Sequence, residues 1–308
     1  MIDLQIKFSE ALNKEEISLL ADQQHIDLVA DYENNPSFVK SLLQDVEPLE
    51  EAMYLFSSRL AKNNYIYVEI LFEIGLYTNI YMSSERVINA ALRGLYKTLK
   101  EYPEFDANIL FICDTANEVK KNNSIVRLAL DYKKDNKVAG IYFINNSSQP
   151  FYEKQKECFL YIKKNALPVT IEVNDLQQLE EAINADINRL AINFNIEINK
   201  QLAYQIYTHR LTLIYSPDKL ITSGAAEDYF HLTNRQASIL GVDVTISDKD
   251  VAKEYKNLLE KQFLRREDIY LYLLKSINAC FADEDSKGVL ITRLVNKFNQ
   301  FYLSIKED

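Results

Sequence analysis

The segment LEEAMYLFSSRLAKNNYIYVEILF, residues 49–72, joins a helical pattern to a strand pattern. Leu49, Met53 and Phe56 recur at a spacing that places them on one face of an α-helix. The β-branched and aromatic run Tyr65–Phe72 follows directly and is typical of a buried β-strand. A helix that leads straight into a buried strand is the repeating unit of α/β folds with a parallel sheet.

The same alternation of short apolar runs and longer amphipathic segments continues along the whole chain. Eight strand-helix units predict a (β/α)8 TIM barrel of the α/β class. No linker rich in Pro, Gly or Ser and no internal repeat divides the chain, so we expect a single domain over residues 1–308. The expected strands are Ile2–Phe8, Tyr65–Phe72, Ala107–Cys113, Val138–Ile144, Pro168–Val173, Arg189–Phe194, Leu211–Tyr215 and Asp243–Ser247.

Several polar residues are predicted to mark helix ends. Asn13 followed by Glu16 has the spacing of a capping box, and Asp175 followed by Gln178 repeats it after the fifth strand. Gly241 is expected to end the helix that precedes the eighth strand. These signals predict where helices begin and end from local sequence alone.

Composition restricts the cell compartment and the classes of partner. The chain has 35 basic and 45 acidic residues, a net charge of −10, and no Lys/Arg cluster, which argues against a nucleic-acid partner. No apolar stretch approaches the roughly 20 residues that a membrane span needs. The start Met1–Leu4 lacks the basic and apolar regions of a signal peptide. We therefore expect a cytoplasmic protein with no membrane partner.

Cysteine, histidine and glycine usage restricts the chemistry. Cys113, Cys158 and Cys280 are far apart in sequence and form no CxxC pair, so we interpret them as reduced core residues. Three histidines and six glycines are too few for a multi-histidine metal site or a glycine-rich phosphate loop. The composition therefore points to no bound cofactor.

Several short stretches resemble the adenosine deaminase family, whose members are zinc-dependent (β/α)8 barrels. Each stretch is short, but their order along the chain is also that of the family, and together they span nearly the whole sequence. The matching stretches are LAKNNYIYVE at residues 60–69, Val138–Ile141 for the fourth strand, Arg189–Leu190 for the sixth, Ser216–Pro217 after the seventh, and Ser276–Phe281 for a late helix.

The resemblance fails at the residues that would bind zinc and perform catalysis. The first strand of the family ends in a His-x-His pair, and the matching residues here are Gln5 and Lys7. The fifth strand of the family supplies a third zinc ligand and a catalytic glutamate, and Ile171 and Asn174 stand at those places. A lysine ammonium repels a metal ion, and an amide cannot act as a general acid or base.

The sixth and eighth strands of the family also carry active-site residues, and most of these are absent here. A water-orienting histidine of the family is matched by Ile192, with Asn193 beside it. Asp248 in Ser247-Asp248-Lys249 is the one zinc ligand of the family that the resemblance retains. We therefore predict no metal and no catalytic residue, and we expect the Lys7 ammonium to pair with Asp248 where the metal would be.

Polar residues at the strand ends could still form a degenerate ligand site at the mouth of the barrel. Ile144 stands at the place of a family glycine that lies against the substrate. The expected lid, between Ala21 and Leu49, is short and polar at residues 31–36 and has little apolar surface, so we expect weak purine binding. The predicted ligand-binding residues are Gln5, Lys7, Asp114, Asn145, Asn174, Asn193, Asp248 and Lys249.

Three functions remain open at this point. The first is a non-catalytic relative of the deaminases that binds a small molecule or a protein partner. The second is an enzyme with zinc-independent chemistry on a purine-like or other small substrate. The third is a structural or oligomeric partner of an active deaminase. The sequence does not fix the oligomeric state.

Overall fold

The structure is a computed structural model of the full chain. It describes residues 1–133, 137–147, 150–187, 189–192, 204–205, 208–215, 238–240, 256, 259–260 and 265–307.

One parallel sheet organises the described residues, and its eight strands are adjacent in chain order from β1 to β8. Seven of the expected strands are confirmed, with small shifts at their ends. The strands are β1 (Ile2–Lys7), β2 (Tyr67–Phe72), β3 (Asp106–Asp114), β4 (Val138–Ile144), β5 (Val169–Val173), β6 (Arg189–Ile192), β7 (Thr212–Tyr215) and β8 (Ser238–Leu240).

β8 is a strand where the sequence predicted the end of a helix. β8 pairs with β7 through Ile214 and Ile239, so this segment is not the end of a helix that stops at Gly241. A short apolar stretch is compatible with either a helix or a strand, and here pairing with β7 decides the outcome. The expected strand Asp243–Ser247 lies outside the described residues.

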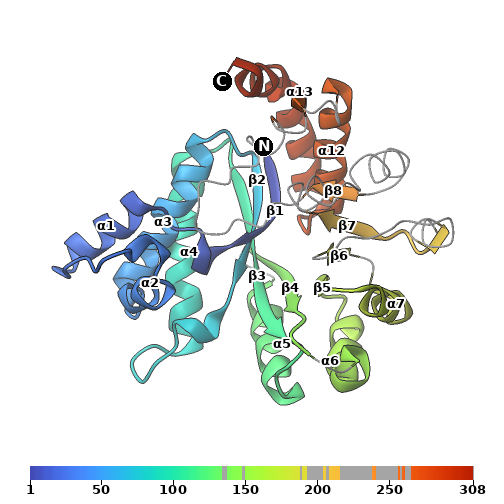
Figure 1. The fold of residues 1–308 in the computed structure, drawn as a ribbon, viewed down its shortest axis with the longest axis horizontal. Coiled ribbons are helices and arrows are strands. Elements are labelled where there is room, and N and C mark those ends of the chain that lie inside the picture. Colours follow the sequence, from blue (N-terminus) through green and yellow to red (C-terminus); the bar gives the residue numbers. More distant parts are fainter. Residues whose placement is uncertain are drawn as a thin grey trace.

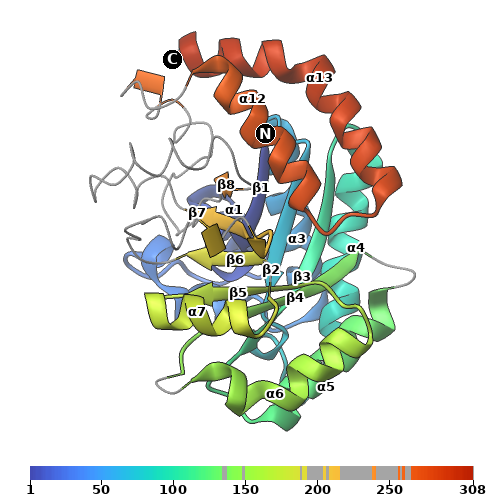
Figure 2. The same cartoon turned by 90° about the vertical axis from the view of Figure 1, so that its right-hand side faces the viewer.

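Helices cover the outside of the curled sheet (Figure 1). α12 contacts both β1 and β8, so the two end strands of the sheet lie beside the same helix (Figure 2). The fold is therefore an α/β fold with a curled parallel sheet. The helices are α1 (Lys14–Gln23), α2 (Pro36–Leu42), α3 (Val46–Lys62), α4 (Ser84–Glu101), α5 (Val119–Lys133), α6 (Phe151–Lys164), α7 (Leu176–Asn184), α12 (Arg266–Ala279) and α13 (Glu284–Glu307), with 3-10 turns η1 (Phe8–Glu10), η2 (Tyr32–Asn34) and η3 (Ile74–Leu76).

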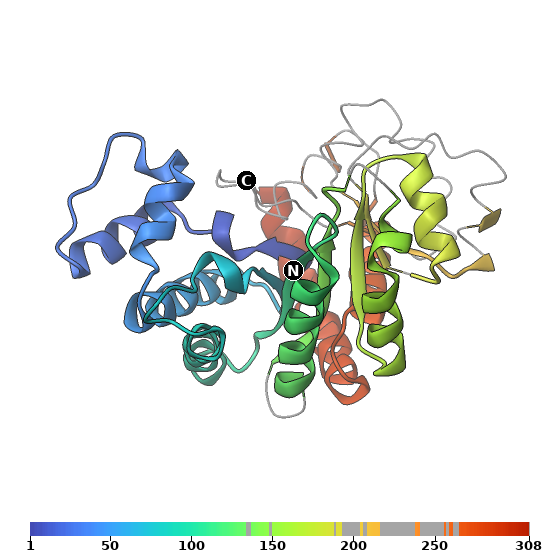
Figure 3. The same cartoon turned by 90° about the horizontal axis from the view of Figure 1, so that it is seen from below.

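Both helix caps that the sequence predicted are present. The Asn13 side chain and Glu16 form a reciprocal capping box at the start of α1. The Asp175 side chain accepts a hydrogen bond from the Gln178 amide at the start of α7, while the Gln178 side chain accepts one from the Asn174 amide. α1 and α2 lie together in a lobe on the β1 side of the sheet (Figure 3).

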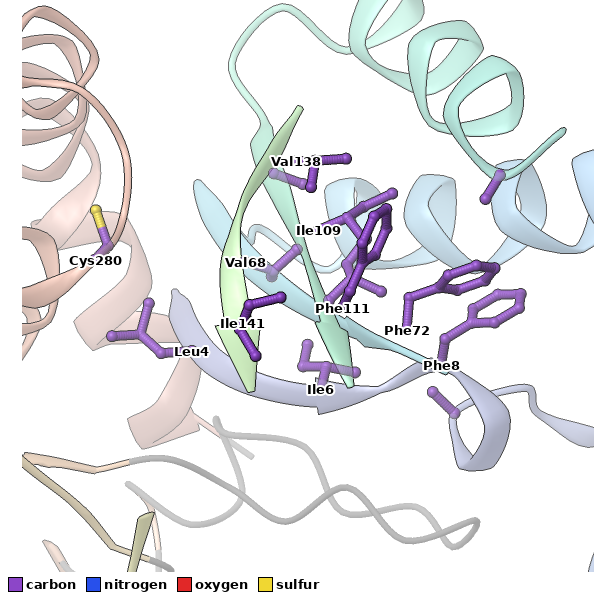
Figure 4. Close-up of a cluster of buried hydrophobic side chains, with 14 of the residues drawn as sticks. Leu4, Ile6, Phe8, Val68, Phe72, Ile109, Phe111, Val138, Ile141 and Cys280 are labelled. Atoms are coloured by element: carbon purple, nitrogen blue, oxygen red, sulfur yellow. The ribbon is translucent and has the colours of Figure 1, made fainter. Parts of the chain in front are cut away.

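The helix-covered face of the sheet is apolar. Leu4 and Ile6 of β1 are buried in the same cluster as Val68 and Phe72 of β2 (Figure 4). Because successive side chains of a strand point to opposite faces, the alternate residues of β1 point to the inner, concave face. In β1 the inner face therefore carries the polar residues Asp3, Gln5 and Lys7.

A buried ion pair spans the inner face near the strand starts. Glu69 of β2 and Arg189 of β6 are almost fully buried, and two bonds join them, one of them 3.3 Å between Oε1 and Nη1. The Phe281 amide donates to Glu69 Oε1 at 2.6 Å, and the Phe281 ring lies 3.6 Å from the guanidinium carbon. The Ala279 carbonyl accepts from Arg189 Nη1 at 3.0 Å. This cluster ties two distant strands to the end of α12.

Some helix-to-strand connections use residues other than glycine in the left-handed region. Asn64, Ala166 and Asp186 have φ values of 62°, 48° and 59° where helices end before β2, β5 and β6. At Ala166 the Leu167 amide donates to the Ile162 carbonyl, the hydrogen bond of a Schellman motif. The chain has six glycines, and none occupies these three positions. The residues there carry a Cβ, which is strained at a positive φ.

The three cysteines are buried as free thiols, which confirms the prediction that they are core residues. Burial, with smaller contributions from nearby carboxylates, raises the pKa of Cys158 to about 12 and that of Cys280 to about 11. Both thiols are therefore protonated and unreactive at neutral pH.

In the part of the chain that the structure describes, no helix combines the length and the apolar character that crossing a bilayer requires.

Replacing Arg189 by methionine should destabilise the protein by about 3–5 kcal/mol, because the buried Glu69 carboxylate loses its counter-charge. Adding Glu69→Gln to that variant should restore part of the loss, since the uncompensated charge is removed. Urea unfolding measures both effects. Lys163→Met, which removes the exposed pair with Asp186, is the control and should have little effect. Equal destabilisation by Arg189→Met and Lys163→Met would contradict the structural role of the buried pair.

Ala166→Gly should stabilise the protein by about 1 kcal/mol, because glycine adopts a positive φ without the penalty that a Cβ imposes. Thermal melting should show a midpoint a few degrees higher. Ala61→Gly, inside α3, is the matched control and should lower the midpoint. A lower midpoint for Ala166→Gly would show that the reversal carries no strain.

Candidate functional site

The carboxyl ends of the strands meet at one edge of the sheet, where ligands bind in most parallel α/β proteins. Lys7 ends β1, Glu73 follows β2 and Asp114 ends β3. Asn145 follows β4 and Asn174 follows β5. The topology therefore brings most of the sequence-predicted ligand residues to the same edge, which we call the mouth.

The two residues at the place of the family's His-x-His pair belong to the inner face of β1. Gln5 is 6% exposed, and its backbone amide donates to the Asp3 carboxylate at 2.9 Å. Lys7 is half-buried, and its Nζ lies 2.6 Å from Glu10 Oε1. Glu10 belongs to η1, the turn that directly follows β1, so the pair forms locally at the strand end.

The surroundings of Lys7 are negatively charged. Burial alone would lower the pKa of the Lys7 ammonium, but the hydrogen bond and charge of Glu10 act in the opposite direction. The charges of Glu172 and Glu73 add to them, and together they raise the pKa above its ordinary value of 10.5. Lys7 therefore remains a cation at every physiological pH.

Glu172 is a site residue that the sequence analysis missed. Tyr142, which belongs to a small cluster of buried side chains with Leu71, Leu110 and Ala191, donates its hydroxyl to Glu172 Oε1 at 3.1 Å. The signal was present in the sequence, because polar Thr170, Glu172 and Asn174 alternate with apolar residues along β5.

Ile171, which the resemblance placed at a zinc-ligand position, lies on the other face of the sheet. It is fully buried and in register with Phe143 of β4. Phe143 packs on Phe159 of α6, with ring centroids 4.8 Å apart, so this face is covered by a helix. The position of β5 that faces the interior is Glu172, one residue later, because side chains alternate between faces.

Asp114, Asn145 and Asn174 belong to one hydrogen-bond network. Asn146 Nδ2 donates to Asp114 Oδ2 at 2.9 Å, and Asn174 Nδ2 donates to the Asn145 carbonyl at 2.9 Å. The Thr115 hydroxyl donates to Asn145 Oδ1 at 2.8 Å. The network links the ends of β3, β4 and β5, so these side chains hold the rim of the mouth in place.

The other sequence-predicted residues, Asn193, Asp248 and Lys249, lie outside the described residues. The expected pair of Lys7 with Asp248 therefore stays a prediction. The partner that the described residues provide for Lys7 is Glu10.

A cavity of about 360 Å³ opens beside Lys7, between the end of β1, α2 and the turn after β2. Its walls include Lys7, Glu10, Val39, Leu43, Glu73 and Tyr77. The sequence analysis expected little apolar surface in this segment of the chain. The structure corrects this, because α2 follows the polar residues 31–36 and buries Phe38, Val39 and Leu42.

The described residues at the mouth do not fit the zinc ion that the resemblance implies. Zinc sites use deprotonated His, Cys, Asp or Glu ligands. Within the described ranges no group of at least three such residues is arranged to hold a metal ion. In addition, the resemblance places Lys7 at the position of a zinc-binding histidine, and its ammonium is a cation.

The pair of Lys7 with Glu10 should contribute a pH-dependent stability. The folded pKa of Lys7 is raised, so the contribution is full below the unfolded pKa and is lost as pH rises through the folded pKa. The free energy of unfolding of the wild type minus that of Lys7→Met should therefore be constant near neutral pH and fall above about pH 10.5. Urea unfolding across this range measures it, with Lys156→Met, from an exposed pair, as control. A difference that grows with alkaline pH would contradict the assignment.

Comparisons with known proteins agree with this fold. The chain is 25% identical over 273 residues to an adenosine deaminase of Haemophilus ducreyi, covering 84% of this chain and 79% of the relative. It is 21% identical over 280 residues to an adenosine deaminase of Streptococcus mutans, covering 88% of this chain and 80% of the relative.

Solved structures with lower sequence identity to this chain have a similar fold. An adenine deaminase from Arthrobacter aurescens superposes with a TM-score of 0.79 at 13% identity, covering 97% of this chain and 98% of the other. Arabidopsis ADAL complexed with IMP superposes with a TM-score of 0.77 at 16% identity, covering 97% of each chain. The sequence model described as adenosine deaminase matches residues 4–297. This chain therefore belongs to the adenosine deaminase family.

Proposed function

We propose that this chain is a member of the adenosine deaminase family that has lost zinc-dependent deamination and binds a small molecule at the mouth of the barrel. The observation that carries the proposal is the Lys7 ammonium, which is held by Glu10 at a position where the family has a zinc ligand. A fixed cation repels a divalent metal ion, and deamination in this family depends on that metal.

The proposal includes a closed (β/α)8 barrel. It is supported by the chain-order sheet and by α12, which contacts both end strands. The high coverage of the deaminase structures by this chain supports it further. In such a barrel, the mouth is the place where ligands bind.

The cavity beside Lys7 supports a ligand-binding role. Its volume of about 360 Å³ lies within the range of small-molecule sites. Its walls combine apolar Val39 and Leu43 with the polar groups of Lys7, Glu10 and Glu73, which is the composition that such sites usually have.

The purified protein should contain no stoichiometric zinc and should not convert adenosine to inosine. Atomic absorption on protein purified in the presence of zinc measures the first, and an absorbance assay measures the second. The double variant Gln5→His/Lys7→His, which restores the His-x-His pair, should take up more zinc than the wild type. About one zinc per chain in the wild type, together with deaminase turnover that follows the protein through purification, would overturn the proposal.

A further inference from the structure

One wall of the mouth cavity carries a tyrosine hydroxyl with no hydrogen-bond partner among the described residues. Tyr77 lines the cavity and is 1% exposed. Its ring stacks on Phe72, with centroids 5.3 Å apart, and meets the Phe8 ring edge-on at 6.0 Å. Within the described part of the chain, no hydrogen bond engages the Tyr77 hydroxyl. Because Tyr77 lines the cavity, its hydroxyl oxygen can accept a hydrogen bond from a ligand there.

Glu73 provides a second unsatisfied group in the same cavity. It follows β2, is half-buried and lines the cavity with Tyr77. No ion pair or side-chain hydrogen bond involves its carboxylate among the residues that the structure describes. The other carboxylate of the cavity wall, Glu10, is already paired with Lys7.

The pKa shifts of two groups at the cavity agree with negative charge from the nearby carboxylates. Burial, together with the charges of Glu73 and Glu10, raises the pKa of the Tyr77 hydroxyl far above its ordinary value. The raised pKa of Lys7 reflects the charges of Glu10, Glu172 and Glu73. The Tyr77 hydroxyl is therefore neutral and lies close enough to Glu73 to feel its charge.

Charges on the remaining walls do not reverse this sign. Lys40 of α2 is the other basic side chain that lines the cavity, and it is exposed to solvent, so water screens its charge. The rest of the wall next to these groups is apolar and consists of Val39, Leu43 and Leu76. The cavity thus combines a negative end with an apolar side.

We propose that the mouth cavity binds a small organic cation, whose ammonium group lies between the Glu73 carboxylate and the Tyr77 hydroxyl oxygen. The hydrocarbon part of the ligand would pack on Val39, Leu43 and Leu76. An ammonium donates to both oxygens at once and gains a charge-assisted hydrogen bond from Glu73. The inference rests on the proposed ligand-binding function and specifies its ligand class.

The same charges disfavour anionic ligands. A phosphate or carboxylate placed in this cavity would face the unpaired Glu73, and the Lys7 ammonium is already neutralised by Glu10. An uncharged ligand would gain the apolar contacts without the ionic one. The cavity should therefore rank ligands of equal shape by charge, with cations first and anions last.

Three probes of similar shape test this ranking: benzylammonium, benzyl alcohol and benzoate. Calorimetric titration of the full chain at constant ionic strength should show benzylammonium binding about tenfold more tightly than benzyl alcohol, with benzoate weakest. Glu73→Gln should reduce the affinity for benzylammonium about tenfold and leave that for benzyl alcohol nearly unchanged. Tyr77→Phe should cause a smaller loss for benzylammonium.

Glu153→Gln is the matched control, since its carboxylate is 70% exposed on α6 and does not line the cavity. It should leave all three affinities unchanged, which separates the site from general attraction of cations to an acidic protein. Thermal melting of each variant verifies that it is folded. Equal affinities for the three probes would overturn the inference, as would a Glu73→Gln variant that binds benzylammonium like the wild type. Either result leaves the zinc content unaffected, so failure here is distinguishable from failure of the proposed function.

Discussion

The buried ion pair between Glu69 and Arg189 is the interaction on which the arrangement of the sheet depends. A buried charge is costly unless it is paired, so β2 and β6 must face each other across the concave side of the sheet. The pair also accepts a hydrogen bond from Phe281 and donates one to Ala279, at the end of α12. Three stretches of sequence that resemble the deaminases, far apart in the chain, thus meet at one point.

At the opposite end of the inner face, a partly buried charge is also balanced by charges of opposite sign. Lys7 is half-buried at the end of β1 and is balanced by Glu10, with Glu73 and Glu172 contributing to the negative surroundings. In the family this place belongs to a metal ion and its ligands. A lysine balanced by carboxylates supplies positive charge without the open coordination position that activates water. The fold is shared with the family, and what the mouth does depends on the side chains placed on that common scaffold.

The cavity at the mouth arises from elements that come together only in the folded chain. α2 contributes apolar side chains, β1 and η1 contribute the pair of Lys7 with Glu10, and the segment after β2 contributes Glu73 and Tyr77. The aromatic contacts of Tyr77 with Phe8 and Phe72 hold its hydroxyl in position for the ligand that we propose. Such preorganisation reduces the entropy that binding costs.

The sequence by itself determined the α/β class, seven of the strands and the caps at Asn13 and Asp175, because these depend on local propensity and spacing. It also placed most strand-end polar residues at one edge, because carboxyl ends of parallel strands share an edge. Only the tertiary structure decided that Ser238–Leu240 is a strand and that Lys7 pairs with Glu10. Strand pairing is set by contacts between residues distant in sequence. Ion-pair partners depend on local geometry that residue spacing does not specify.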